Sequence, residues 1–93
     1  SVHVMPILTS KYHDSTISIG YSDQGPVELK VNGITRTKAA QASYLKLATS
    51  LQTGYEWHEW VEGICLIRPT HAKLTLTCNN QTIADQQFNF EPD

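Results

Sequence analysis

The sequence predicts one α+β domain, rich in β-structure and built around a single central helix. Apolar and polar residues alternate in the first and last thirds of the chain, as is typical of half-buried strands. Between them, a segment free of Gly and Pro repeats its apolar residues at helical spacing. The predicted order is β-β-β-α-β-β-β, an antiparallel sheet or small open barrel packed on one central helix, in a single domain of residues 1–93.

The first third predicts three strands. A short strand opens the chain within residues 2–8, and residues 16–21 then alternate apolar and polar side chains. The segment Asp23-Gln24-Gly25-Pro26 combines the residues that favour a tight turn. Residues 27–31 alternate again, so we expect a hairpin. Asn32-Gly33 then predicts a second turn.

The middle of the chain predicts the helix. Thr35 or Thr37 serves as its N-cap, it runs to about Gln52, and Gly54 lies where a C-terminal glycine is expected. The expected buried stripe follows the spacing i, i+4, i+7, i+8 and consists of Ala40, Tyr44, Leu47, Ala48 and Leu51.

The last third predicts a meander of strands over residues 60–67, 72–78 and 82–90. With the first turn centred between residues 71 and 72, Cys65 and Cys78 would lie opposite each other, at a spacing that permits a disulfide. Such a bridge would contribute roughly 3 kcal/mol and would indicate an oxidising compartment. The alternative is a pair of reduced thiols in the core.

Composition excludes several classes of function. The net charge is −2 and the seven Lys and Arg are scattered, so no basic surface for nucleic acid is expected. No apolar run approaches the roughly 20 residues that span a bilayer, so no membrane span is expected. Charged residues make up only 17% of the chain, and Thr, Ser, Gln and Asn supply much of its polarity. This composition favours a secreted or periplasmic protein.

One aromatic and acidic stretch is the candidate binding site. Because neighbouring residues on a strand face opposite sides, each face would carry an aromatic ring and a carboxylate. At least one ring is therefore expected to be partly exposed, where it suits a protein hot spot or a sugar platform. The alternative is that the rings only cover the core. The candidate residues are Tyr55, Glu56, Trp57, His58, Glu59 and Trp60.

No catalytic, metal or cofactor site is expected. The segment His58-Glu59-Trp60-Val61-Glu62 has a glutamate where the zinc-protease pattern His-Glu-x-x-His requires its second histidine. His13-Asp14-Ser15 contains the residue types of a hydrolytic triad, but adjacent residues cannot converge on one reacting atom.

These observations predict a non-enzymatic, exported binding module that recognises a protein or a glycan. Two alternatives stay open. One is an inhibitor or immunity protein whose acidic residues block another protein's active site. The other is a subunit of a symmetric homo-oligomer whose edge strands pair between copies. Receptor-binding subunits of bacterial toxins have a comparable element order, without a shared motif.

Overall fold

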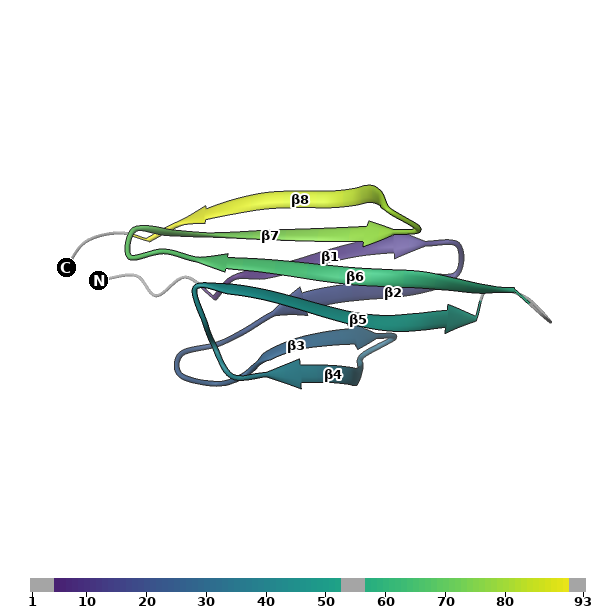
Figure 1. The fold of residues 1–93 in the computed structure, drawn as a ribbon, viewed down its shortest axis with the longest axis horizontal. Coiled ribbons are helices and arrows are strands. Elements are labelled where there is room, and N and C mark those ends of the chain that lie inside the picture. The colour runs from purple at the N-terminus through teal and green to yellow at the C-terminus, as the bar shows by residue number, and fades with distance from the viewer. Residues whose placement is uncertain (1–4, 53–56, 91–93) are drawn as a thin grey trace.

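The structure is a computed structural model that describes residues 5–52 and 57–90, and these residues are all-β (Figure 1). Within each of two four-stranded sheets, every strand pairs antiparallel with the next, and the orders are β1-β2-β3-β4 and β5-β6-β7-β8. The strands are β1 (Ile7–Tyr12), β2 (Ser15–Gly20), β3 (Val27–Val31), β4 (Ile34–Ala39), β5 (Tyr44–Gln52), β6 (His58–Ile67), β7 (His71–Cys78) and β8 (Gln81–Asn89).

The predicted central helix is wrong, and with it the α+β class. The residues assigned to it form β4 and β5 instead. Leu47 and Leu51 are buried as predicted, but a spacing of four residues puts two side chains on one face of a strand as well as of a helix. Other residues of the expected stripe distinguish a strand from a helix. Ala40 and Tyr44 are exposed, whereas the predicted helix would have buried both. Strand alternation fits the segment better than helical periodicity does.

Two hairpins close with two-residue turns in which both residues have positive φ. These are Asn32-Gly33, with φ of 53° and 81°, and Asn79-Asn80, with φ of 51° and 67°. Asparagine and glycine tolerate this left-handed conformation, which matches the twist of the flanking strands. The predicted turn at Asn32-Gly33 is confirmed, and so is the predicted break between the strands of residues 72–78 and 82–90. In each turn the first asparagine also accepts a hydrogen bond from the backbone of a neighbouring strand.

The two sheets pack face to face around one hydrophobic core. Strand β1 lies beside β8 and β4 beside β5, so the sheets adjoin at both edges. At the second edge the Arg36 guanidinium donates a hydrogen bond of 3.1 Å to the Ser50 carbonyl on β5. The buried core consists of Leu8, Ile17, Ile19, Tyr21, Val27, Leu29, Val31, Leu47, Leu51, Val61, Cys65, Ala72, Leu74, Leu76 and Cys78.

Gly63 on β6 lies where the two sheets pack closely. A Cβ atom built on this glycine would lie 2.6 Å from Ile19 Cδ1 and 3.3 Å from Leu29 Cδ1. Because both neighbours belong to the other sheet, a side chain at position 63 would hold the sheets apart. The missing side chain therefore sets the local spacing of the sandwich.

The predicted disulfide is wrong. Both thiols are free and buried, with Cys65 opposite Leu74 and Cys78 opposite Val61. The turn between β6 and β7 is centred between Pro69 and Thr70, which shifts the register by four residues from the predicted one. Four residues along a strand span about 13 Å, beyond disulfide reach. Export thus loses the support of the disulfide and stays a prediction from composition.

Candidate functional site

The predicted site lies where β6 begins. Trp57 precedes the strand and is 74% exposed, while His58, Glu59 and Trp60 are its first three residues. His58 and Trp60 are exposed and Glu59 between them is half-buried, as alternation on a strand requires. Tyr55 and Glu56 fall outside the described residues.

The backbone of Trp60 is held from both sides. Trp60 pairs with Ser50 on β5, and on the other side it exchanges two hydrogen bonds with Asn79. The Asn79 backbone N–H donates to the Trp60 carbonyl at 2.8 Å, and the Trp60 N–H donates to Asn79 Oδ1 at 3.0 Å. Here β5 and β6 extend past the end of β7 (Figure 1). The indole ring, which is 51% exposed, thus stands on a fixed piece of backbone.

Glu59 does not share the surface of Trp60, because it joins the two sheets. The Tyr12 hydroxyl on β1 donates to Glu59 Oε1 at 3.1 Å, and His13 Nε2 lies 3.8 Å from Glu59 Oε2. Hydrogen bonds to Cys78 and to Glu59, together with desolvation, raise the pKa of Tyr12 to about 12. The phenol therefore stays a neutral donor. The structure separates this carboxylate from the exposed indole that the sequence grouped with it.

The outer face of the second sheet adds three apolar side chains to Trp60. Along β6, Ile64 and Leu66 point the same way as Trp60 and are half-buried. Tyr44 on β5 pairs with Leu66 and is 55% exposed. We name this set, Tyr44, Trp60, Ile64 and Leu66, the tryptophan face.

The charges on this half of the sheet are paired. Lys46 Nζ lies 2.9 Å from Glu62 Oε2, an ion pair that crosses from β5 to β6 within the tryptophan face. The hydrogen bond to Glu62 and its negative charge raise the pKa of Lys46. The face therefore presents apolar surface around a neutralised pair of charges.

The other half of the sheet, on β7 and β8, is polar. Lys73 Nζ lies 3.7 Å from Asp85 Oδ2, and the Thr75 hydroxyl donates to Asp85 Oδ1 at 3.2 Å. The outer face is thus divided into a half that carries the tryptophan face and a half that is polar.

The titratable groups give little basis for covalent or metal chemistry. Burial raises the pKa of the Cys65 thiol to about 11 and raises that of Cys78 as well. Both thiols therefore stay protonated at neutral pH, which opposes a nucleophilic role. Within residues 5–52 and 57–90, no group of three or more His, Cys, Asp or Glu side chains is arranged to hold a metal ion. The same residues contain no helix able to cross a bilayer.

Sequence reasoning missed most of the tryptophan face. Tyr44 was assigned to the buried stripe of a helix, although strand alternation from Tyr44 to Gln52 puts it on the face opposite Leu47 and Leu51. The outward positions of Ile64 and Leu66 follow from the same alternation along β6. A period of two was the signal that could have found all three side chains.

Comparison with known proteins returned no match among family models, curated proteins or solved structures.

Proposed function

We propose that this protein is a non-enzymatic binding module that recognises a partner protein through the tryptophan face. One observation carries the proposal: the half-exposed Trp60 ring stands on a strand that is hydrogen-bonded on both sides. Tryptophan is the side chain most enriched among interface residues that dominate binding energy. A ring on fixed backbone also loses little entropy when it is bound, and this preorganisation favours affinity.

The neighbours of Trp60 favour a protein over a glycan. Sugars bind where hydrogen-bonding groups surround an aromatic ring, whereas the outward row of β6 continues from Trp60 through one acid to the aliphatic side chains of Ile64 and Leu66. The acid on this row, Glu62, is already bound to Lys46. An apolar strip with neutralised charges and a polar border suits the apolar patch of another protein.

The proposal is tested with an alanine pair. Trp60→Ala removes the exposed ring, and Ile34→Ala, in the turn region of the other sheet, removes an apolar side chain of similar exposure as a matched control. For a partner isolated with the wild-type chain, we expect Trp60→Ala to weaken the Kd about 30-fold, the equivalent of about 2 kcal/mol. Ile34→Ala should leave the Kd within twofold. Calorimetry with purified partner measures both.

Two outcomes contradict the proposal. If Trp60→Ala binds the partner as tightly as the wild type and melts at the same temperature, the partner does not use the tryptophan face. If a glycan array instead yields an oligosaccharide whose binding is lost in Trp60→Ala, the ligand is a sugar and the assignment of a protein partner is wrong.

A further inference from the structure

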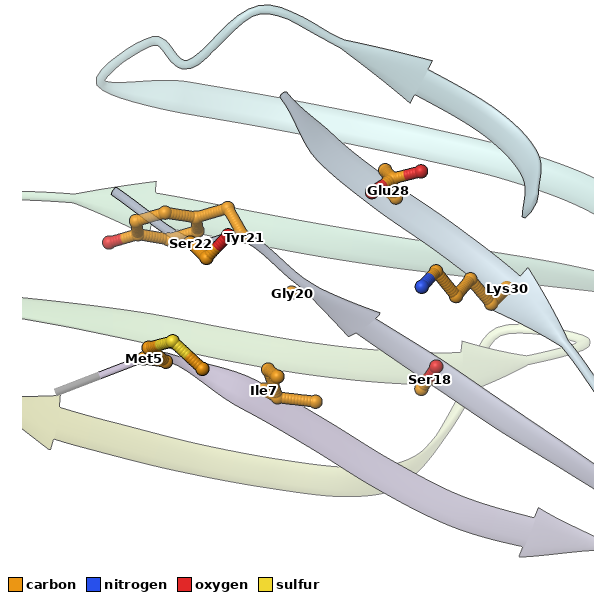
Figure 2. Close-up of a pocket in the computed structure, with 8 residues that line it drawn as sticks. All are labelled: Met5, Ile7, Ser18, Gly20, Tyr21, Ser22, Glu28 and Lys30. Carbon is orange, nitrogen blue, oxygen red and sulfur yellow. The ribbon is translucent and has the colours of Figure 1, made fainter. Parts of the chain in front are cut away.

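The outer face of the first sheet contains a hollow of about 160 Å³, far from Trp60 in the strand order (Figure 2). It is centred on Gly20, which pairs with Ile7 on β1 and with Glu28 on β3. The missing side chain at position 20 lets the backbone of β1 approach β2 closely at Pro6 and Ile7. The lining residues are Met5, Ile7, Ser18, Gly20, Tyr21, Ser22, Glu28 and Lys30.

The close approach at Gly20 involves backbone atoms of β1. A Cβ atom on Gly20 would lie 2.7 Å from the Pro6 carbonyl oxygen and 2.9 Å from Ile7 Cα, both of which are backbone atoms. No side chain fits at this position without moving β1 away from β2. The close packing of these two strands at Gly20 therefore forms part of the floor of the hollow.

One wall of the hollow is apolar and exposed. Met5 and Ile7 are 55% and 49% exposed, although both are large apolar side chains. A closed cavity of roughly 150 Å³ can hold benzene. The hollow thus has room for a branched aliphatic group or a ring lying against these two side chains.

The opposite wall carries one charge of each sign. Glu28 and Lys30 lie two residues apart on β3, about 6.6 Å along the strand. The Thr35 hydroxyl donates to Glu28 Oε1 at 2.8 Å, and Figure 2 shows the Lys30 ammonium extending toward the space above Gly20. Neither charge has an ion-pair partner among the residues that the structure describes.

We propose that this hollow binds a small zwitterion with an apolar side group, of the chemical class of a free aliphatic or aromatic amino acid. Its side group covers Met5 and Ile7, its carboxylate meets Lys30, and its ammonium meets Glu28. A simple anion would be attracted by Lys30 but repelled by Glu28. A simple cation would be attracted by Glu28 but repelled by Lys30. Only a ligand with both charges can form a favourable contact with Glu28 and with Lys30 at once, because these opposite charges, a few ångströms apart, attract the two ends of such a ligand.

Four ligands with one side chain test the charge requirement on the wild-type protein. Leucine carries both charges, N-acetyl-leucine only the negative one, leucinamide only the positive one, and N-acetyl-leucinamide neither. Titration in two-dimensional amide NMR follows the signals of Ile7, Ser18 and Gly20. We expect saturable shifts of these signals with leucine, and a Kd at least fivefold weaker for each of the other three compounds.

Two charge variants test the protein side. Lys30→Gln and Glu28→Gln are each expected to weaken leucine binding at least fivefold. Lys30→Gln should also remove the preference for a ligand with a carboxylate, and Glu28→Gln the preference for a ligand with an ammonium group. Lys11→Gln is the matched control, because Lys11 is an exposed lysine on β1 that does not line the hollow. It should leave the Kd within twofold.

Three results overturn the proposal: equal affinity for all four compounds, tightest binding of a compound with a single charge, or no saturable shift at Gly20. Because the ligand series uses the unaltered chain, these outcomes do not depend on whether a variant folds. The tryptophan face is not involved, so Trp60→Ala should bind leucine like the wild type.

Discussion

Replacing Gly63 by alanine is expected to destabilise the protein, because the two sheets meet at this residue. The new Cβ would lie 2.6 Å from Ile19 Cδ1, where ordinary contact begins at 3.4 Å, so the overlap is 3.4 − 2.6 = 0.8 Å. Ile19 is fully buried and has little room to move. Overpacking of this kind costs about 1–3 kcal/mol. Equilibrium unfolding in urea, extrapolated to water, measures the loss.

A second substitution shows whether the overlap is the cause. Ile19→Val removes the Cδ1 atom and by itself should cost about 0.5–1.5 kcal/mol. In the double variant Gly63→Ala/Ile19→Val the clash is relieved, so the loss should be smaller than the sum of the single losses by about 1 kcal/mol. Ile17→Val, also fully buried on β2, is the control and should add normally to Gly63→Ala. Additive losses for Ile19→Val would refute the reasoning.

Three further outcomes follow from the core and the turns. Both thiols should resist a thiol reagent at pH 8 in the folded protein and react when it is unfolded in denaturant without reductant; one disulfide per chain would contradict the structure. Folding raises the pKa of Cys65 from 9.0 to about 11 and that of Tyr12 from 10.0 to about 12. Their contribution to stability is therefore complete below pH 9, declines as the unfolded chain ionises, and is lost once the pH has risen through 11 and 12. The melting temperature should hold steady just below pH 9 and fall between pH 9 and pH 12. Asn79→Gly keeps the positive φ but removes the hydrogen bond to the Trp60 N–H, which should cost about 0.5–1.5 kcal/mol in urea unfolding, whereas Asn80→Gly, as a control, should change stability little.

Local patterns in the sequence were sufficient to predict most strands. The segment Val27–Val31 was predicted with the bounds that it has, because its apolar residues alternate between two turn signals. Strands β6, β7 and β8 were predicted with ends that differ by one or two residues. In these segments the side-chain pattern and the turn chemistry point to the same structure, so a local reading suffices.

The prediction failed where one pattern fitted two structures or where pairing decided the outcome. Leu47 and Leu51 suit a helix and a strand equally, and the segment's good helix formers decided the choice wrongly. The position of Cys65 opposite Leu74 depends on the centre of a turn, and an error of two residues at that centre shifts the pairing by four. The sequence predicted that at least one aromatic ring of the stretch is partly exposed, as Trp57 and Trp60 are. It did not predict their separation from Glu59, because that depends on how the two sheets meet.

The strand order has a consequence for how the chain assembles. Every hydrogen-bonded strand neighbour is also the next strand in the sequence, so each sheet arises from one continuous half of the polypeptide, joined by residues 40–43. Ladder formation therefore closes only short loops, and the long-range step is the docking of two preformed meanders. A polypeptide cleaved between β4 and β5 would keep every strand pairing within one fragment, which makes this junction the natural place to divide the protein into two complementing pieces.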